Sequence, residues 1–158
     1  RNFSLLFNAT LIKSNVRFDE SGIIKTEDRP MQGQSPYIIN AGLYYQNEKW
    51  GLMSSLLYNR LGKRIIGIGK SNSTNHDVSV NIPDTYEMPR NSLDFTISKK
   101  LGKLIELKAG VKDILAEKIV YKQFPQFVDA AGQLQKREQT TKSYRPGRSV
   151  SVGITFSF

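Results

Sequence analysis

SVSVGITFSF, residues 149–158, alternates strictly between apolar side chains and small or polar ones. The apolar positions are Val150, Val152, Ile154, Phe156 and Phe158. A period of two predicts a β-strand with one apolar face and one polar face. No sequence follows this strand to cover its apolar face, so we expect lipid to cover it.

The same alternation occurs in five earlier segments. They are NFSLLFNATLIKS (2–14), PYIINAGLYYQ (36–46), WGLMSSLLYN (50–59), SLDFTISKKL (92–101) and LIELKAGV (104–111). Each is about as long as the ~10 residues that cross an outer membrane as a strand. No segment shows a comparable helical period, so the sequence predicts an all-β protein with six main strands.

The connections between these strands alternate in length. Short turns are expected at about 47–49 and 101–103, and long loops at about 17–35, 69–90 and 116–143. Transmembrane barrels combine short periplasmic turns with long extracellular loops. The pattern therefore predicts an antiparallel transmembrane β-barrel with the last strand ending at the periplasmic side. A soluble β-sandwich is the alternative on loop lengths alone.

Aromatic residues lie near the ends of two predicted strands. Tyr37 and Tyr45 bound the apolar face of one strand, and Trp50 and Tyr58 bound that of the next. Aromatic girdles mark both membrane interfaces of outer-membrane barrels. Tyrosine is also a good strand former, but that does not explain its pairing at both ends of an apolar face.

The composition narrows the possible classes. The chain has 158 residues, no cysteine and a formal net charge of +9. Disulfides and thiolate metal sites are excluded, and no run of eighteen apolar residues predicts a transmembrane helix. The start, RNFSLLFNAT, has no initiator Met and no signal-peptide pattern, so we expect a chain cut from a longer one. The positive charge makes anionic partners worth testing.

Four segments carry a family resemblance: GQSPYIINAGLYYQ (33–46), LYNRLGKRI (57–65), PDTYEMPRNSLDFTISKKLGKLIELKAGVKDIL (83–115) and SYRPGRSVSVGITFSF (143–158). They resemble the C-terminal strands of TonB-dependent outer-membrane receptors, especially those with a carboxypeptidase-regulatory-like domain. The ending that closes on Phe158 resembles the assembly signal that the barrel-insertion machinery reads. Receptors of this family form 22-stranded barrels with a plugged lumen.

The resemblance implies a bacterial outer-membrane location and energised import of a scarce nutrient: a siderophore, vitamin, oligosaccharide or peptide. It implies as partners outer-membrane lipid and lipopolysaccharide, the missing N-terminal strands and plug, the barrel-assembly machinery, and TonB through the missing part. A surface lipoprotein is a further candidate partner. The plug and the energy-coupling box are absent here, so this chain by itself is not expected to transport.

Candidate catalytic and ligand-binding patterns are weak. GIGKSNST (67–74) has Arg64 where a phosphate-binding loop needs its first glycine, and His76 has no second metal ligand near it. Asp94, Glu106 and Asp113 are not paired by spacing as acid and base. We expect no enzyme activity, and no catalytic, cofactor-binding or metal-binding residues.

Two rival functions follow from the charge and the strand count. A small basic β-barrel that binds nucleic acid would fit the charge, but the aromatic faces are nearly uncharged and Lys and Arg gather at strand ends. We therefore expect no nucleic-acid partner. A small complete outer-membrane barrel with a structural role would need at least ~8 strands. Segment 116–143 is partly extended but poorly alternating, so we interpret it as an extracellular hairpin.

Overall fold

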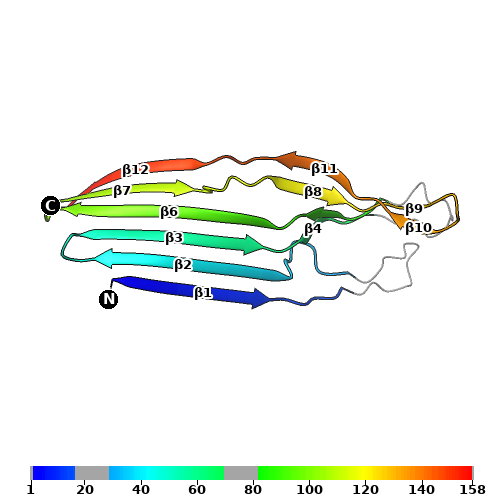
Figure 1. Cartoon of the computed structure of the whole chain (residues 1–158), viewed down its shortest axis with the longest axis horizontal. Helices are drawn as coiled ribbons and strands as arrows, with labels where there is room; N and C mark the ends of the chain where they lie inside the picture. Colours follow the sequence, from blue (N-terminus) through cyan, green and yellow to red (C-terminus); the bar gives the residue numbers. More distant parts are fainter. Residues whose placement is uncertain (1, 17–28, 70–81, 158) are drawn as a thin grey trace.

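The computed structural model describes residues 2–16, 29–69 and 82–157, and every regular element within these ranges is a β-strand (Figure 1). All strand pairs are antiparallel. The predicted all-β, antiparallel class is therefore confirmed. Within the same ranges, no helix is long and apolar enough to cross a membrane.

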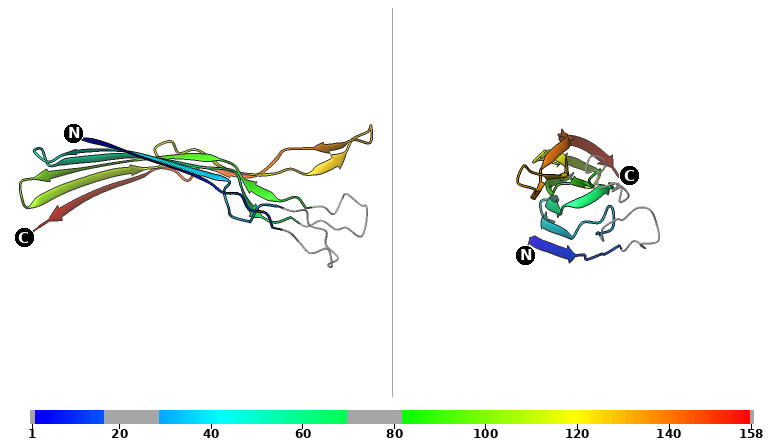
Figure 2. Two further views of the ribbon diagram at one scale, coloured as in Figure 1. Left: turned by 90° about the horizontal axis from the view of Figure 1, so that it is seen from below. Right: turned by 90° about the vertical axis from the view of Figure 1, so that its right-hand side faces the viewer.

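The largest sheet has six strands in the order β1-β2-β3-β6-β7-β12. Their bounds are Phe3–Leu11 (β1), Tyr37–Asn47 (β2), Leu52–Leu61 (β3), Arg90–Leu101 (β6), Ile105–Lys112 (β7) and Ser149–Phe156 (β12). They correspond to the six alternating segments of the sequence. The sheet is curved but does not close, because β1 and β12 lie at opposite edges and do not pair with each other (Figure 2).

The remaining strands form an extension beyond one end of this sheet (Figure 1). A four-stranded sheet has the order β11-β8-β5-β4, and β9 pairs with β10. The bounds are Arg64–Gly67 (β4), Thr85–Glu87 (β5), Ile119–Gln123 (β8), Gln126–Val128 (β9), Leu134–Lys136 (β10) and Gln139–Tyr144 (β11). The segment expected as the long loop 69–90 thus contains β5. The segment expected as the long loop 116–143 contains β8, β9, β10 and most of β11. Of the expected loop 17–35, only residues 29–35 are described.

Two short turns connect strands at the end of the six-stranded sheet away from the extension (Figure 1). We call this end the turn end, and we call the end from which the extension projects the extension end. β2 ends at Asn47 and β3 begins at Leu52, whereas β6 ends at Leu101 and β7 begins at Ile105. Gly51 and Gly102 have φ angles of 55° and 68° in these turns. A left-handed backbone is readily adopted by glycine, so both chain reversals depend on it.

Strand pairing in the six-stranded sheet proceeds without a register shift. Directly opposed residues of antiparallel strands point to the same face. Phe7, Ala41, Tyr58 and Leu93 therefore share one face, because each is opposed to the next. The period-two alternation of all six strands is thus combined into one apolar face and one polar face.

Very little of the molecule is buried. Among the described hydrophobic residues only Ile65 belongs to a core, at 2% exposed, whereas Leu5 is 76% and Val152 is 79% exposed. A large exposed apolar surface marks a site where a membrane or another protein binds.

Candidate functional site

The apolar face is the most extensive feature of the six-stranded sheet. In register, its members from β1 to β12 are Phe3, Leu5, Phe7, Ala9, Leu11; Tyr37, Ile39, Ala41, Leu43, Tyr45; Leu52, Leu56, Tyr58; Leu93, Phe95, Ile97, Leu101; Ile105, Leu107, Ala109, Val111; and Val150, Val152, Ile154, Phe156. The exceptions on this face are Asn47, Ser54, Arg60, Asn91 and Lys99. Both charged exceptions lie toward the strand ends, so the middle of the face carries no charge.

A hydrogen-bonded group bounds the apolar face at the extension end. Tyr58 Oη donates to Asn91 Oδ1 at 2.7 Å, and Arg60 Nη1 donates to the same oxygen at 2.9 Å. Arg60 Nε donates to Tyr37 Oη at 3.4 Å. Asn91 in turn donates its backbone N–H and its Nδ2 to Glu117, both at 2.8 Å. We call these five residues the girdle cluster.

The girdle cluster joins two residues singled out from the sequence with three that were not. Tyr37 and Tyr58 were expected near strand ends at the edge of the apolar face, and Arg60 connects them through Asn91. Hydrogen bonds from the Asn91 side chain and backbone hold the pKa of the Glu117 carboxyl below its usual value. Glu117 comes from a segment expected as a loop, so no strand periodicity in the sequence points to it.

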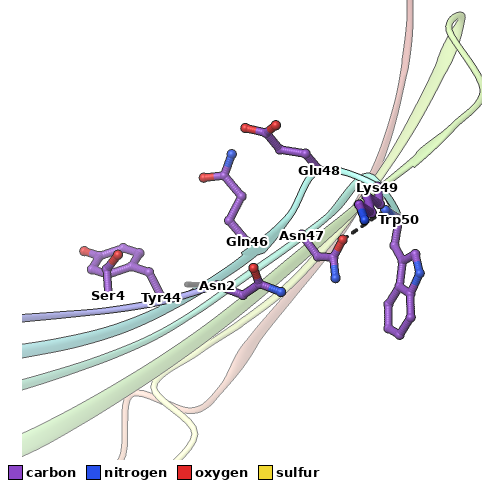
Figure 3. A pocket seen from close by; sticks show the side chains of 8 residues that line it. All are labelled: Asn2, Ser4, Tyr44, Gln46, Asn47, Glu48, Lys49 and Trp50. Carbon is purple, nitrogen blue, oxygen red and sulfur yellow. Dashed lines mark hydrogen bonds between the residues drawn. The ribbon is translucent and has the colours of Figure 1, made fainter.

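Aromatic residues also bound the apolar face at the turn end. The Phe3 and Tyr45 rings lie 4.8 Å apart between centroids. Trp50 lies in the turn before β3 rather than on the strand, and it is 63% exposed. The backbone N–H of Trp50 donates to Asn47 Oδ1 at 3.2 Å. Figure 3 shows the Trp50 ring directed to the opposite side of the turn from Gln46 and Glu48.

The final strand β12 contributes four of the five residues expected as the assembly signal. Val150, Val152, Ile154 and Phe156 lie on the apolar face, opposite Val111, Ala109, Leu107 and Ile105 of β7. Phe158 lies outside the described residues. Within the described residues the other edge of β12 has no neighbouring strand, and the same holds for β1.

The opposite face of the sheet is polar through its centre. Ser55 and Thr96 share a hydrogen bond of 2.6 Å between their hydroxyl oxygens, and Asn59 Nδ2 donates to Asn40 Oδ1 at 2.7 Å. The apolar exceptions on this face are Leu6, Ile38, Met53, Leu57 and Leu61, and its other positions carry glycine, Tyr44, or hydroxyl, amide and charged groups. These two pairs of hydrogen-bonded side chains leave other polar groups of the face available to water or to another polar surface.

The carboxylates noted in the sequence make structural contacts. Asp94 Oδ1 accepts the backbone N–H of Asp113 at 2.8 Å, Asp113 pairs with Arg90, and Glu106 pairs with Lys108 at 3.2 Å. Within the described ranges, no cluster of three or more His, Cys, Asp or Glu side chains is arranged to hold a metal ion. His76 and most of segment 67–74 lie outside the described residues.

Comparison of the chain with models of known protein families, with curated proteins and with solved structures gives no match. Function is therefore inferred from the apolar face, its two aromatic ends and the open edges of the sheet.

Proposed function

We propose that this chain is the C-terminal part of a bacterial outer-membrane β-barrel, in a receptor of the TonB-dependent type that imports a scarce nutrient. The observation that carries the proposal is the single uncovered apolar face formed in register by six strands. In the proposal this face contacts lipid, the polar face lines the interior, and the extension lies outside the cell.

The dimensions of the apolar face fit a bilayer. Tyr37 and Tyr45 lie at the two ends of β2. Eight residues at ~3.3 Å rise and a tilt of ~40° span roughly 20 Å, close to the ~25 Å apolar band of outer-membrane barrels. The girdle cluster and Trp50 then lie at the two interfaces, where amphipathic rings contact both lipid and water. The uncharged middle of the face lies between them.

The open edges support a larger barrel. Unpaired backbone groups cost several kcal/mol each in lipid, so a strand there needs neighbours on both sides. β1 and β12 each have one neighbour within the described residues. The missing N-terminal strands of the receptor would pair with both edges, and the barrel-assembly machinery would hold the β12 edge until the barrel closes. This arrangement gives the terminal alternating strand a role in assembly.

The polar face fits a hydrated interior that meets a plug. Its hydroxyl and amide ladders, with Asp94 and Lys108, favour contact with water or a polar domain. Coupling to TonB and passage of cargo belong to the plug and the remaining strands. Lipopolysaccharide phosphates would contact cations near the extension end of the apolar face.

The pairing pattern favours this proposal over two alternatives. Strands β8 to β11 pair within the extension and do not add to the six-stranded sheet, so they do not complete a small barrel. For nucleic-acid binding, bases would stack on aromatic side chains set among cations. Among the described residues, the cations on the apolar face are Arg60 and Lys99, both toward its ends.

The orientation can be tested with single cysteines, since this chain has none. Ala131 is exposed in the tight turn between β9 and β10, and Lys49 is exposed in the turn between β2 and β3. Ala131→Cys in the full-length receptor should react with a membrane-impermeant maleimide on intact cells. Lys49→Cys should react only after the outer membrane is opened. Equal labelling of both on intact cells, or labelling of Lys49→Cys alone, contradicts the proposal.

A further inference from the structure

A cavity of about 320 Å³ lies at the extension end of the sheet, apart from the apolar face. Four segments form it: the residues after β1, those before β2, residues 63–65 at the start of β4, and β5. Its lining residues are Ile12, Lys13, Ser14, Pro30, Gln34, Pro36, Lys63, Arg64, Ile65 and Tyr86. We call it the rim cavity. Its volume is at the small end of the range for ligand-binding pockets, about 300–1,000 Å³.

The described residues that line the rim cavity carry charge of one sign. They include Lys13, Lys63 and Arg64 but no carboxylate. Arg64 is neutralised from outside the lining, because Nε and Nη2 contact Glu87 Oε2 at 3.0 and 2.8 Å. Lys13 and Lys63 make no ion pair with another described residue. The cavity therefore has an excess of positive charge.

Lys63 is held in place by aromatic rings rather than by an anion. Its Nζ lies 4.0 Å from the Tyr86 ring centroid and 4.3 Å from that of Phe124. These rings attract the ammonium and fix its position. Burial, with the nearby Lys136 adding to it, lowers the pKa of Lys63, and the weaker influence of Glu138 acts in the opposite direction. An anion bound beside Lys63 would compensate for the burial of the ammonium group and for its repulsion by Lys136.

The rim cavity also contains an unsatisfied acceptor. Gln34 Oε1 is buried and accepts no hydrogen bond from a described residue. A buried acceptor without a donor destabilises the folded state, because it has lost its hydrogen bonds to water. Pro30, Pro36 and Ile65 supply the apolar part of the wall. Cation, acceptor and apolar surface are thus combined in one small space.

We propose that the rim cavity binds a small organic anion with an apolar body and at least one hydroxyl or amine donor. Its carboxylate, phosphate or sulfonate group contacts Lys63, its body packs against the proline and isoleucine side chains, and its donor reaches Gln34 Oε1. A polymeric anion is too large for this volume. The inference goes beyond the proposed function, because binding here requires neither transport nor a lipid-facing surface.

The test measures binding of 4-hydroxybenzoate to the purified full-length receptor by calorimetric titration. The neutral analogue 4-hydroxybenzamide controls for partition into detergent. We expect saturable binding of the acid and binding of the amide weaker by about tenfold, which corresponds to ~1.4 kcal/mol. Absence of saturable binding up to ~10 mM, or equal binding of acid and amide, overturns the proposal.

Matched variants assign the contacts. Lys63→Met should weaken acid binding by about tenfold, and Lys63→Arg should retain it. Lys142→Met is the control, because Lys142 Nζ also lies over a ring, 5.1 Å from the Tyr144 centroid, but outside the cavity. Gln34→Leu should abolish any preference for 4-hydroxybenzoate over benzoate. Equal losses in the Lys63→Met and Lys142→Met variants would show a nonspecific charge effect and overturn the site.

The assay reports ligand binding and not orientation or insertion. A failed titration therefore leaves the cysteine-labelling result intact, and inverted labelling leaves a positive titration intact. The two proposals can fail separately.

Discussion

Replacing Leu56 with Arg tests whether the apolar face contacts lipid. Leu56 lies in the middle of β3, opposite Leu43 and Phe95, and no charge lies near it on that face. An arginine at the bilayer midplane of a barrel costs ~2–4 kcal/mol. The neighbouring Ser55 points to the polar face, where Ser55→Arg loses one hydrogen bond to Thr96, worth about 1 kcal/mol.

The expected difference between the two arginine variants is therefore about 1–3 kcal/mol, or roughly 5- to 150-fold in the folding equilibrium. The measurement is equilibrium unfolding of the full-length receptor by guanidinium chloride in lipid vesicles, followed by heat-modifiable gel migration. Leu56→Ala separates the loss of side-chain contacts from the cost of the charge. If Leu56→Arg is no more destabilising than Ser55→Arg after this correction, the apolar face does not contact lipid.

Three further predictions concern the ends of the sheet. Deleting Phe158 should slow barrel insertion in a pulse-chase experiment while leaving the stability of the finished barrel nearly unchanged; unchanged kinetics would remove its role as an assembly signal. Trp50 fluorescence, taken as the difference from Trp50→Phe, should be quenched more by lipids brominated near the headgroup than by lipids brominated at the chain end, and the reverse order would remove Trp50 from the interface. The pKa of Glu117 is lowered in the folded state, so its contact with Asn91 stabilises the fold above the ordinary carboxyl pKa and is lost as pH falls through the folded-state pKa. Glu117→Gln should therefore reduce the pH dependence of thermal stability on the acid side by ~0.5–1 kcal/mol. An unchanged pH profile in this variant would contradict the prediction.

The six strands of the large sheet could be predicted because alternation is a local signal. Each of them alternates largely between apolar and polar or small side chains, so period two alone identifies both the strand and its faces. One boundary differed from the expectation: Trp50 was placed at the start of a strand, but the left-handed Gly51 extends the turn to that point. A single glycine conformation is not visible in hydrophobic periodicity.

The extension could not be predicted as a sheet. β4 has four residues and β5 has three, too few to show a period. β4 pairs with β5, and β5 pairs with β8, which lies more than thirty residues further along the chain. The rim cavity could not be predicted for the same reason, because its lining residues come from four segments that are separated in the sequence. Two of the five residues of the girdle cluster were predicted: the two tyrosines follow from strand ends, whereas Glu117 depends on the path between β7 and β8.

The shift-free pairing of the large sheet limits how this part of the chain can vary in length. The extension already contains two register shifts. One lies between Ile65 and Gly67 in β4, and the other lies between Thr140 and Lys142 in β11. In the large sheet, deleting one residue from β3 would exchange the faces of the β3 residues beyond the deletion. Deleting two would restore the faces and shift one aromatic end by ~6.6 Å. Among chains that descend from a common ancestor with this one, we expect even-numbered length changes within the six strands and single-residue changes in the extension.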